Sequence, residues 1–229
     1  MVGCDGTQGG ARDLRRQLKL YVVSDRALAR GRSEEDMLRA ATAGGATAFQ
    51  LRGKEWSDRE LFSVGKRLAS LCRELDVLFL VNDRVDIAMA CGADGVHLGK
   101  CDLPVVVARR LMGSAAVIGA SAQNVTEARD ALSAGANYIA ASPVWATPTK
   151  PDAPNPLGLG GMRAICRAVS SPVIAIGGMK AENAEEVIRY GADGVAVVSA
   201  IVAADDPSTA ARRIRQAVDA GESRRELER

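Results

Sequence analysis

The chain of 229 residues has the length of one globular domain and carries 30 basic against 28 acidic residues, a formal net charge of +2. So small a charge gives no support for binding to nucleic acid or to an anionic membrane. No stretch approaches the 18 consecutive apolar residues that would cross a bilayer. Aromatic residues make up 3% of the chain, so aliphatic side chains must fill the core, which favours an α/β architecture.

The first segment, residues 1–17, is predicted to be a disordered leader, and it lacks the apolar core of a signal peptide. The chain has five cysteines and no CxxC pair: Cys4, Cys72, Cys91, Cys101 and Cys166. An odd number of scattered cysteines is typical of free thiols in a reducing compartment rather than of disulfides or a zinc site. We therefore expect a cytoplasmic protein.

From Leu18 onward, short β-branched runs alternate with segments of helical periodicity. Strands are predicted at residues 18–24, 46–51, 77–81, 94–98, 115–119, 136–141, 172–176 and 193–198. Helices are predicted at residues 33–44, 57–75, 84–91, 103–112, 124–134, 160–169, 181–190 and 207–220, with N-caps at Ser33, Ser57, Asn124 and Ser208. Residues 18–221 then form one domain, followed by a polar tail at residues 222–229.

A short pattern recurs along the chain, in which a glycine, an alanine and a small residue precede a strand. Its alanines are Ala46, Ala93, Ala136 and Ala192, spaced 47, 43 and 56 residues apart, and they mark every second predicted strand. Eight strands alternating with eight helices predict a parallel sheet, and the fourfold spacing favours closure into a single-domain (β/α)8 TIM barrel. A doubly wound open sheet is the alternative. In a barrel the repeat lies opposite the functional end, so we interpret it as structural.

Three successive predicted strands, the second to the fourth, are followed at once by charged and polar residues. In the segment 50–54, Arg52 and Lys54 suit a phosphate clamp, with a solvated loop as the alternative. Asp83 follows the third strand and Asp102 the fourth, and each carboxylate suits either a cation or the cap of the next helix. Two carboxylates beside basic groups are typical of a Mg²⁺-bound diphosphate.

His97, at the end of the fourth strand, is the only histidine in the chain. A lone histidine there is more often a hydrogen-bonded barrel residue than a general base. Without a second histidine a zinc site of the usual kind is excluded, and without a GxSxG motif so is serine-triad hydrolysis. The sequence contains neither a Rossmann GxGxxG motif nor a P-loop, so a dinucleotide or a nucleoside triphosphate is not indicated as a ligand.

The last three strands end in groups suited to a phosphomonoester. The longest loop, residues 142–161, follows the sixth strand, contains the segment 147–150 and has the length of a lid or binding loop. Residues 177–178 are both glycine, and with the helix start after the eighth strand they match the usual phosphate site of these barrels. A mouth with two anion sites predicts an enzyme that joins two phosphorylated molecules.

These loops, in this order, resemble the thiamine phosphate synthase family over residues 18–207. The resemblance rests on segments at successive strand ends, namely residues 20–25, 50–54, 82–84, 95–99 with 102–104, 119–121, 147–150, 175–178 and 198–201. It implies a transferase of thiamine biosynthesis that joins 4-amino-5-hydroxymethyl-2-methylpyrimidine diphosphate to a thiazole phosphate. Diphosphate leaves, the aminopyrimidine stabilises a carbocation, and the thiazole nitrogen captures it to give thiamine phosphate.

The family's motifs also imply which residues of this chain do the work. Pyrimidine diphosphate binding is implied for Gln50, Leu51, Arg52, Gly53, Lys54, Asn82, Ser121 and Lys150, with Arg52, Lys54 and Lys150 assisting departure of the diphosphate. Thiazole phosphate binding is implied for Thr147, Pro148, Thr149, Gly177, Gly178, Val198 and Ser199. Asp83 and Asp102 are implied as the ligands of Mg²⁺, the expected cofactor.

Two positions depart from the family's pattern. Gly53 stands where a glutamate is usual, and we expect a change in loop stiffness rather than a loss of activity. Gln123 stands where the family commonly has a histidine that resembles the acid–base group of a related thiazole tautomerase, so the tautomerase reaction is disfavoured.

Two other functions remain as alternatives: a tautomerase-like isomerase on the same barrel, and a non-catalytic protein that binds thiamine intermediates. The expected partners are small-molecule substrates, not nucleic acid or membrane, and the residues leave open whether the chain forms a homo-oligomer.

Overall fold

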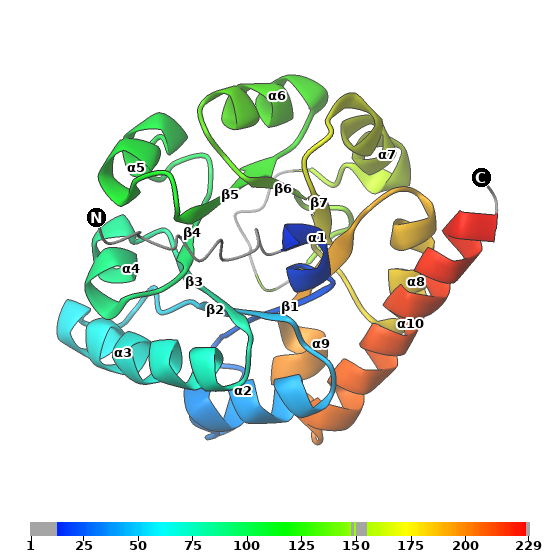
Figure 1. Ribbon diagram of the computed structural model, residues 1–229. Coiled ribbons are helices and arrows are strands. Elements are labelled where there is room, and N and C mark those ends of the chain that lie inside the picture. The colour runs from blue at the N-terminus through cyan, green and yellow to red at the C-terminus, as the bar shows by residue number, and fades with distance from the viewer. Residues whose placement is uncertain (1–12, 148, 150–154, 228–229) are drawn as a thin grey trace, which may run out of the picture.

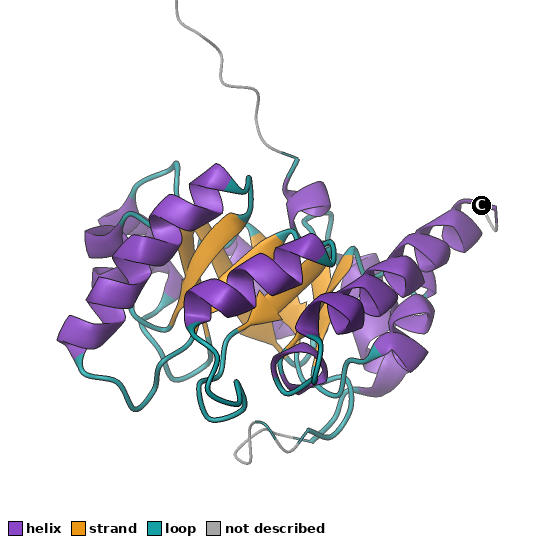
Figure 2. Ribbon diagram, turned by 90° about the horizontal axis from the view of Figure 1, so that it is seen from below, coloured by secondary structure: helices purple, strands orange, loops and turns teal. Residues whose placement is uncertain are grey.

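The computed structural model describes residues 13–147, 149 and 155–227, and within them eight strands close into a parallel barrel (Figures 1 and 2). They are β1 (Leu20–Val23), β2 (Ala48–Leu51), β3 (Leu78–Asn82), β4 (Gly95–Leu98), β5 (Val117–Ala122), β6 (Tyr138–Ala141), β7 (Val173–Ile176) and β8 (Gly194–Val197). Each strand pairs with its neighbours in the chain, and Leu20 of β1 lies opposite Val195 of β8. The predicted TIM barrel is therefore confirmed, and the open sheet is wrong.

The helices form a ring outside the strands (Figure 1). In the described residues they are α1 (Leu14–Gln17), α2 (Glu34–Ala43), α3 (Asp58–Glu74), α4 (Val85–Cys91), α5 (Val105–Met112), α6 (Val125–Ser133), α7 (Gly158–Ala168), α8 (Ala181–Arg189), α9 (Ser199–Val202) and α10 (Pro207–Leu227). The sequence predicted all of them except the short helices α1 and α9, which are too brief to show a helical periodicity.

Side chains at three of the four predicted N-caps mark where their helices begin. Ser33, Ser57 and Asn124 each accept a hydrogen bond from the backbone N–H three residues later. The prediction for Ser208 is wrong, because Asp206 accepts the backbone N–H groups of Ser208 and Thr209 instead. Helix α10 begins at Pro207, one residue before Ser208, as its predicted range has it. The missing N–H of proline suits the first helical position.

The strands are buried on both faces, and successive side chains alternate between two apolar clusters. In β1, Leu20 and Val22 face the layer between sheet and helices, whereas Tyr21 and Val23 face the barrel interior. The interior cluster is filled by aliphatic residues and by two tyrosines, Tyr21 and Tyr138. The strands thus carry polar groups only where they point into the barrel or toward its mouth.

The recurring pattern of the sequence has a shared structural purpose at the N-terminal end of the barrel. In each copy the small polar residue accepts a hydrogen bond from the backbone N–H near the start of the preceding strand. The pairs are Thr47 with Leu20, Asp94 with Phe79, Asn137 with Ile118 and Asp193 with Val173, at 2.8 to 3.1 Å. These contacts link odd strands to even strands and support the structural interpretation of the repeat.

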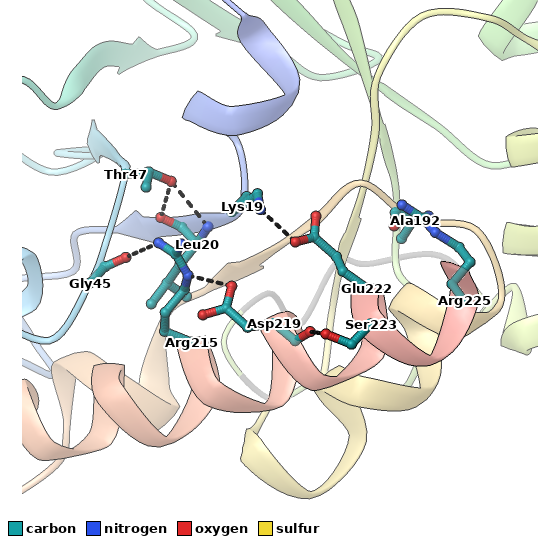
Figure 3. A network of polar contacts seen from close by, with 10 residues as sticks. All are labelled: Lys19, Leu20, Gly45, Thr47, Ala192, Arg215, Asp219, Glu222, Ser223 and Arg225. Atoms are coloured by element: carbon teal, nitrogen blue, oxygen red, sulfur yellow. Dashed lines mark hydrogen bonds and ion pairs between the residues drawn. The ribbon is translucent and has the colours of Figure 1, made fainter. Parts of the chain in front are cut away.

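Helix α10 extends across the seam of the barrel and holds its N-terminal end from outside (Figure 3). Arg215 donates to the carbonyl oxygen of Gly45 at 3.0 Å, and Arg225 donates to that of Ala192 at 2.9 Å. Glu222 forms an ion pair with Lys19, just before β1. Gly221 lets the helix approach α8, because a Cβ there would lie 2.7 Å from the Glu185 carbonyl oxygen.

Both ends of the described chain differ from the sequence-based expectation. Residues 14–17, placed in the disordered leader, form helix α1, which is capped by the Asp13 side chain and tied by an ion pair between Arg15 and Asp193. Residues 222–227, placed in the tail, continue α10 and contact the barrel. Residues 1–12 and 228–229 lie outside the described residues.

Four of the five cysteines lie in the described residues, and all four are free thiols: Cys72, Cys91, Cys101 and Cys166. Cys4 lies outside them. None of the helices described here has the length and apolar character needed to cross a membrane.

Candidate active site

A cavity of about 490 Å³ lies at the C-terminal ends of the strands, and residues from all eight strands or their following loops line it. The predicted site residues found in its wall are Gln50, Arg52, Lys54, Asn82, Asp83, Asp102, Ser121, Thr147, Thr149, Gly177, Gly178, Val198 and Ser199. The barrel thus brings together groups that are spread over 150 residues of sequence.

Two predicted residues lie elsewhere. The Leu51 side chain is fully buried in the layer between sheet and helices, because it alternates with the inward-facing Gln50. Gly53 does not line the cavity and packs against the Trp56 indole. A Cβ added at Gly53 would lie 2.7 Å from the Trp56 Cδ2 atom. Neither offers a side chain to the cavity, so a binding role for Leu51 or Gly53 stays a prediction that only their backbone groups could fulfil. Pro148 and Lys150 lie outside the described residues.

The loop after β2 presents two cations to the cavity, and the first of them is held firmly. The Arg52 guanidinium donates to the Asp25 carboxylate at 2.8 Å, and the Arg52 backbone N–H donates to the Ser24 hydroxyl at 3.0 Å. Lys54 is exposed and close enough to Asp83 to lower the pKa of that carboxyl. One cation is therefore preoriented, and the other can reach a ligand.

Asp83 and Asp102 lie side by side although they follow different strands. Burial and the hydrogen-bonded, negatively charged Asp102 neighbour raise the pKa of Asp83 to about 7. Asp83 also has a left-handed backbone conformation, with φ of 62°, which is uncommon outside glycine. Its backbone N–H donates to the carbonyl oxygen of His97 at 2.9 Å, so β4 fixes its position.

Neither aspartate caps the helix that follows it. No side chain caps α4, which begins after Arg84, or α5, which begins after Pro104. Asp102 instead accepts the backbone N–H of Gly99 at 2.6 Å and closes the turn after β4. The capping alternative is therefore wrong, and both carboxylates face the cavity.

The opposite part of the cavity wall is built mainly from backbone and hydroxyl groups. Gly177 and Gly178 follow β7 with φ of 98° and 69°, a left-handed conformation that glycine adopts without strain. The loop after β6 lies against them, since a Cβ on Gly177 would be 2.5 Å from the Pro143 Cβ. Ser199 begins helix α9, whose first N–H groups have no partner within the helix.

A chain of buried polar groups crosses the barrel interior beneath the cavity. Gln50 donates to the Tyr21 hydroxyl, and the Tyr138 hydroxyl donates to that of Tyr21 at 3.2 Å. The Tyr138 oxygen lies 2.9 Å from Nδ1 of His97, and Nε2 of His97 lies 3.0 Å from the Ser121 hydroxyl. His97 is thus a hydrogen-bonded barrel residue, as the sequence indicated.

The two tyrosines of this hydrogen-bonded series were not among the residues predicted from the sequence. A usable signal existed, because Tyr21 and Tyr138 occupy inward positions of strands in which every residue is buried. A buried tyrosine hydroxyl requires a hydrogen-bond partner, so two such residues in a chain with three tyrosines indicate an internal polar network.

The side chains of the cavity decide which metal ion it could hold. In the part of the chain that the structure describes, no three His, Cys, Asp or Glu side chains gather to hold a metal ion. The Asp83–Asp102 pair supplies oxygen ligands only, from two carboxylates that repel each other in the absence of a cation. This chemistry fits Mg²⁺, which commonly takes one or two carboxylates and completes its shell with water and phosphate oxygens.

The fold and this cavity together define a (β/α)8-barrel enzyme whose active site combines cations, a carboxylate pair and a glycine-rich loop. The chain belongs to the thiamine monophosphate synthase family, whose family model matches residues 20–201. The resemblance seen in the strand-end motifs is therefore confirmed, and members of this family are transferases.

Individual relatives agree over most of the chain. It is 51% identical to a thiamine-phosphate synthase of Chloroflexus aurantiacus, over 87% of this chain and 92% of that one. It is 48% identical to a thiamine-phosphate synthase of Moorella thermoacetica, over 88% and 96%. The solved structure of a thiamine phosphate pyrophosphorylase from Pyrococcus furiosus superposes with a TM-score of 0.85 at 44% identity, covering 92% of this chain and 100% of that one.

Proposed function

We propose that this protein joins 4-amino-5-hydroxymethyl-2-methylpyrimidine diphosphate to a thiazole phosphate, giving thiamine phosphate and diphosphate in the cytoplasm. The observation that carries this proposal is the single cavity in which cations and a carboxylate pair from β2–β4 face a glycine and hydroxyl surface from β6–β8. A wall divided in this way suits two different phosphorylated substrates held in one space.

The half of the cavity formed after β2–β5 binds the pyrimidine diphosphate. Arg52 and Lys54 contact the diphosphate oxygens, with Lys150 as a third cation. Arg52 suits this role because its guanidinium is preoriented by Asp25 at 2.8 Å and matches phosphate geometry. Gln50, Asn82 and Ser121 supply hydrogen bonds for the pyrimidine ring and the diphosphate.

Asp83 and Asp102 would hold Mg²⁺ between themselves and the diphosphate oxygens. When bound there, the ion supplies positive charge that stabilises the leaving diphosphate. The raised pKa of Asp83 supports this assignment, since a cation between the two carboxylates would relieve the repulsion that raises it.

The half of the cavity formed after β6–β8 binds the thiazole phosphate. Thr147 and Thr149 offer hydroxyl groups, with Pro148 between them. Gly177 and Gly178 allow close approach of the backbone, and Val198 and Ser199 bring the start of α9 to the anion.

The chain's own residues accelerate a dissociative displacement without a dedicated general base. Arg52, Lys54 and Lys150 neutralise the charge that grows on the departing diphosphate as the C–O bond breaks. The cavity holds the two rings in line, so that the thiazole nitrogen lies close to the pyrimidine methylene carbon when the carbocation forms. This mechanism suits a cavity that is rich in anion ligands and contains the chain's only histidine, His97, within a hydrogen-bonded chain.

The direct test mixes the purified protein with both substrates and Mg²⁺, with and without EDTA, and measures diphosphate and thiamine phosphate. We expect both products in equal amounts, and neither in EDTA. Product formation that EDTA leaves unchanged would reject the metal assignment but keep the transferase. No product under any condition, together with tight binding of thiazole phosphate, would favour the tautomerase-like isomerase or the non-catalytic binding protein.

A further inference from the structure

The segment 24–26 follows β1 directly and lies beside the loop between β2 and α3. The two strands pair in parallel, and the Ser24 backbone N–H continues the pairing by donating to the Gln50 carbonyl oxygen at 2.9 Å. None of the three residues lines the cavity. Each of them contacts the loop after β2, which presents Arg52 and Lys54 to the cavity. The segment therefore lies behind the two cations.

Two of these contacts hold Arg52, and chemistry fixes their donor directions. The Arg52 backbone N–H donates to the Ser24 hydroxyl oxygen at 3.0 Å, and its Nη1 donates to Oδ2 of Asp25 at 2.8 Å. Peptide and guanidinium nitrogens only donate, and a carboxylate only accepts. The other oxygen of Asp25 accepts the Ala27 backbone N–H at 3.1 Å, so both oxygens have a fixed partner. The side chains of Asp25 and Arg52 are 14% and 21% exposed, which partly shields their ion pair from salt.

The third contact holds the far side of the same loop. The Arg26 guanidinium lies 3.6 Å above the Trp56 ring and donates to the Glu60 carboxylate at 2.6 Å. Trp56 in turn packs against Gly53. Lys54 therefore lies between two anchored positions of the loop, residues 52 and 56.

The charge of Asp25 has the wrong sign for a residue that attracts an anion. A carboxylate paired with a phosphate-binding guanidinium repels an incoming diphosphate. The order that it imposes opposes this cost, because an arginine side chain fixed beforehand loses less conformational freedom when the ligand binds. Among the described residues, the Arg52 guanidinium donates through Nη1 alone. Its Nε and Nη2 edge, which can form paired hydrogen bonds with a phosphate, stays available.

We propose that Asp25 is a positioning residue, which holds Arg52 so that its Nε and Nη2 edge meets the leaving diphosphate, while Ser24 and Arg26 hold the loop around it. The inference rests on the proposed function, because it takes the anion at Arg52 to be a diphosphate. It differs in sign from a purely electrostatic role. Removal of the Asp25 charge should weaken diphosphate binding, whereas the loss of a repulsive charge alone would strengthen it.

Asp25→Asn is the sharpest variant, because its amide oxygen can still accept the Ala27 N–H while its amide nitrogen cannot accept from Arg52. Calorimetric titration with inorganic diphosphate in the presence of Mg²⁺ should show a Kd raised by about tenfold, the order of loss expected when a binding group is slightly misplaced. In an Arg52→Met background the same substitution should raise the Kd by less than about twofold, or lower it, because the group that Asp25 positions is absent.

The matched control is Asp219→Asn, which breaks an aspartate–arginine pair of 2.9 Å with Arg215 at the opposite end of the barrel. It should leave the Kd for diphosphate unchanged. Thermal unfolding shows whether each variant is folded. If Asp25→Asn does not fold, Asp25→Ser repeats the test, because a serine hydroxyl can keep the turn contact to Ala27 without a charge.

Steady-state kinetics separates positioning from general damage. Asp25→Asn should lower kcat/KM for the pyrimidine diphosphate by about tenfold and change the KM for the thiazole phosphate by less than about twofold, because Arg52 contacts only the first substrate. A damaged barrel would impair the use of both substrates.

The proposal and the proposed function fail separately. A Kd in Asp25→Asn that equals or lies below the wild-type value overturns the positioning role, and so does a loss that is equally large in the Arg52→Met background. In either case a wild type that forms thiamine phosphate keeps the proposed function. A wild type that binds no diphosphate overturns both. A wild type that forms no thiamine phosphate but shows the coupling between Asp25 and Arg52 refutes the proposed function alone and supports the positioning role.

Discussion

Asp83 combines three unfavourable features at a single residue. It is partly buried, its backbone is left-handed with φ of 62°, and its carboxyl lies against that of Asp102. Residues held in such conformations persist where the surrounding structure and the function require them. Here both carboxylates face the cavity, and the proposed function uses them as oxygen ligands of Mg²⁺.

Replacement of the Asp83 or Asp102 carboxylate should lower activity without lowering stability. Asp83→Asn or Asp102→Asn should reduce Mg²⁺-dependent diphosphate release by about a hundredfold or more, because one charged ligand of the ion is lost. The same changes should leave the melting temperature in EDTA unchanged or raise it, since they remove the repulsion between the two groups. Asparagine also tolerates the left-handed conformation of residue 83.

The matched control is Asp86→Asn, which removes a carboxylate that pairs with Arg84 and does not line the cavity. It should retain near-normal turnover. Wild-type turnover in both Asp83→Asn and Asp102→Asn would reject the metal assignment.

The loop between β2 and α3 shows how an element accommodates a departure from the family's pattern. Trp56 packs against Gly53, and the Arg26 guanidinium lies 3.6 Å above the Trp56 ring while pairing with Glu60. A glutamate at position 53 would have to displace this stack. The sequence predicts that glycine in place of glutamate at position 53 changes the stiffness of this loop. The packing of Trp56 against Gly53 gives that prediction a physical basis.

Gly53→Glu should raise the KM for the pyrimidine diphosphate by about tenfold, or about 1.4 kcal/mol, because Trp56 must move and Lys54 is carried with it. Adding Trp56→Ala should recover much of that loss, since the indole no longer occupies the space. Steady-state kinetics of the two single variants and the double variant measure this coupling. Strictly additive effects would show that Trp56 and residue 53 act independently.

At the scale of the whole molecule, the polar contacts of α10 lie at the end of the barrel opposite the cavity. Its contacts to Gly45, Ala192 and Lys19 join segments that precede β2, β8 and β1. The helix therefore bridges the place where the last strand meets the first, and it stabilises closure without lining the cavity.

Arg225→Met should lower the free energy of unfolding by about 1–2 kcal/mol, because the Ala192 carbonyl oxygen loses a charged donor. For a chain of this size the melting temperature should fall by about 2–8 °C. Turnover should be unchanged at temperatures below the transition. Glu226→Gln, an exposed change on the same helix, is the control. A large loss of activity in folded Arg225→Met would contradict the separation of the two ends.

Much of this architecture is encoded locally. The eight strands and eight longer helices follow from β-branched runs, helical periodicity and capping residues. Both boundaries of every strand lie within two residues of the prediction except the C-terminal end of β5, which residues 120–122 extend. Arg52, Asp83, Asp102 and the glycine pair were recognisable because they follow strands whose ends meet at one edge of a parallel barrel. Local patterns are enough for these predictions because each of them depends only on the strand or helix to which the residue belongs.

Contacts between distant elements could be decided only by the tertiary structure. Tyr21 and Tyr138 are 117 positions apart and meet through their hydroxyl groups, a contact that depends on the stagger of the closed sheet. The same closure brings the end of α10 against the segments that precede β1 and β8. The sequence by itself therefore determined the barrel and most of the predicted residues that line the cavity. Barrel closure decided which inward side chains touch, because that depends on distances and directions between strands remote in the chain.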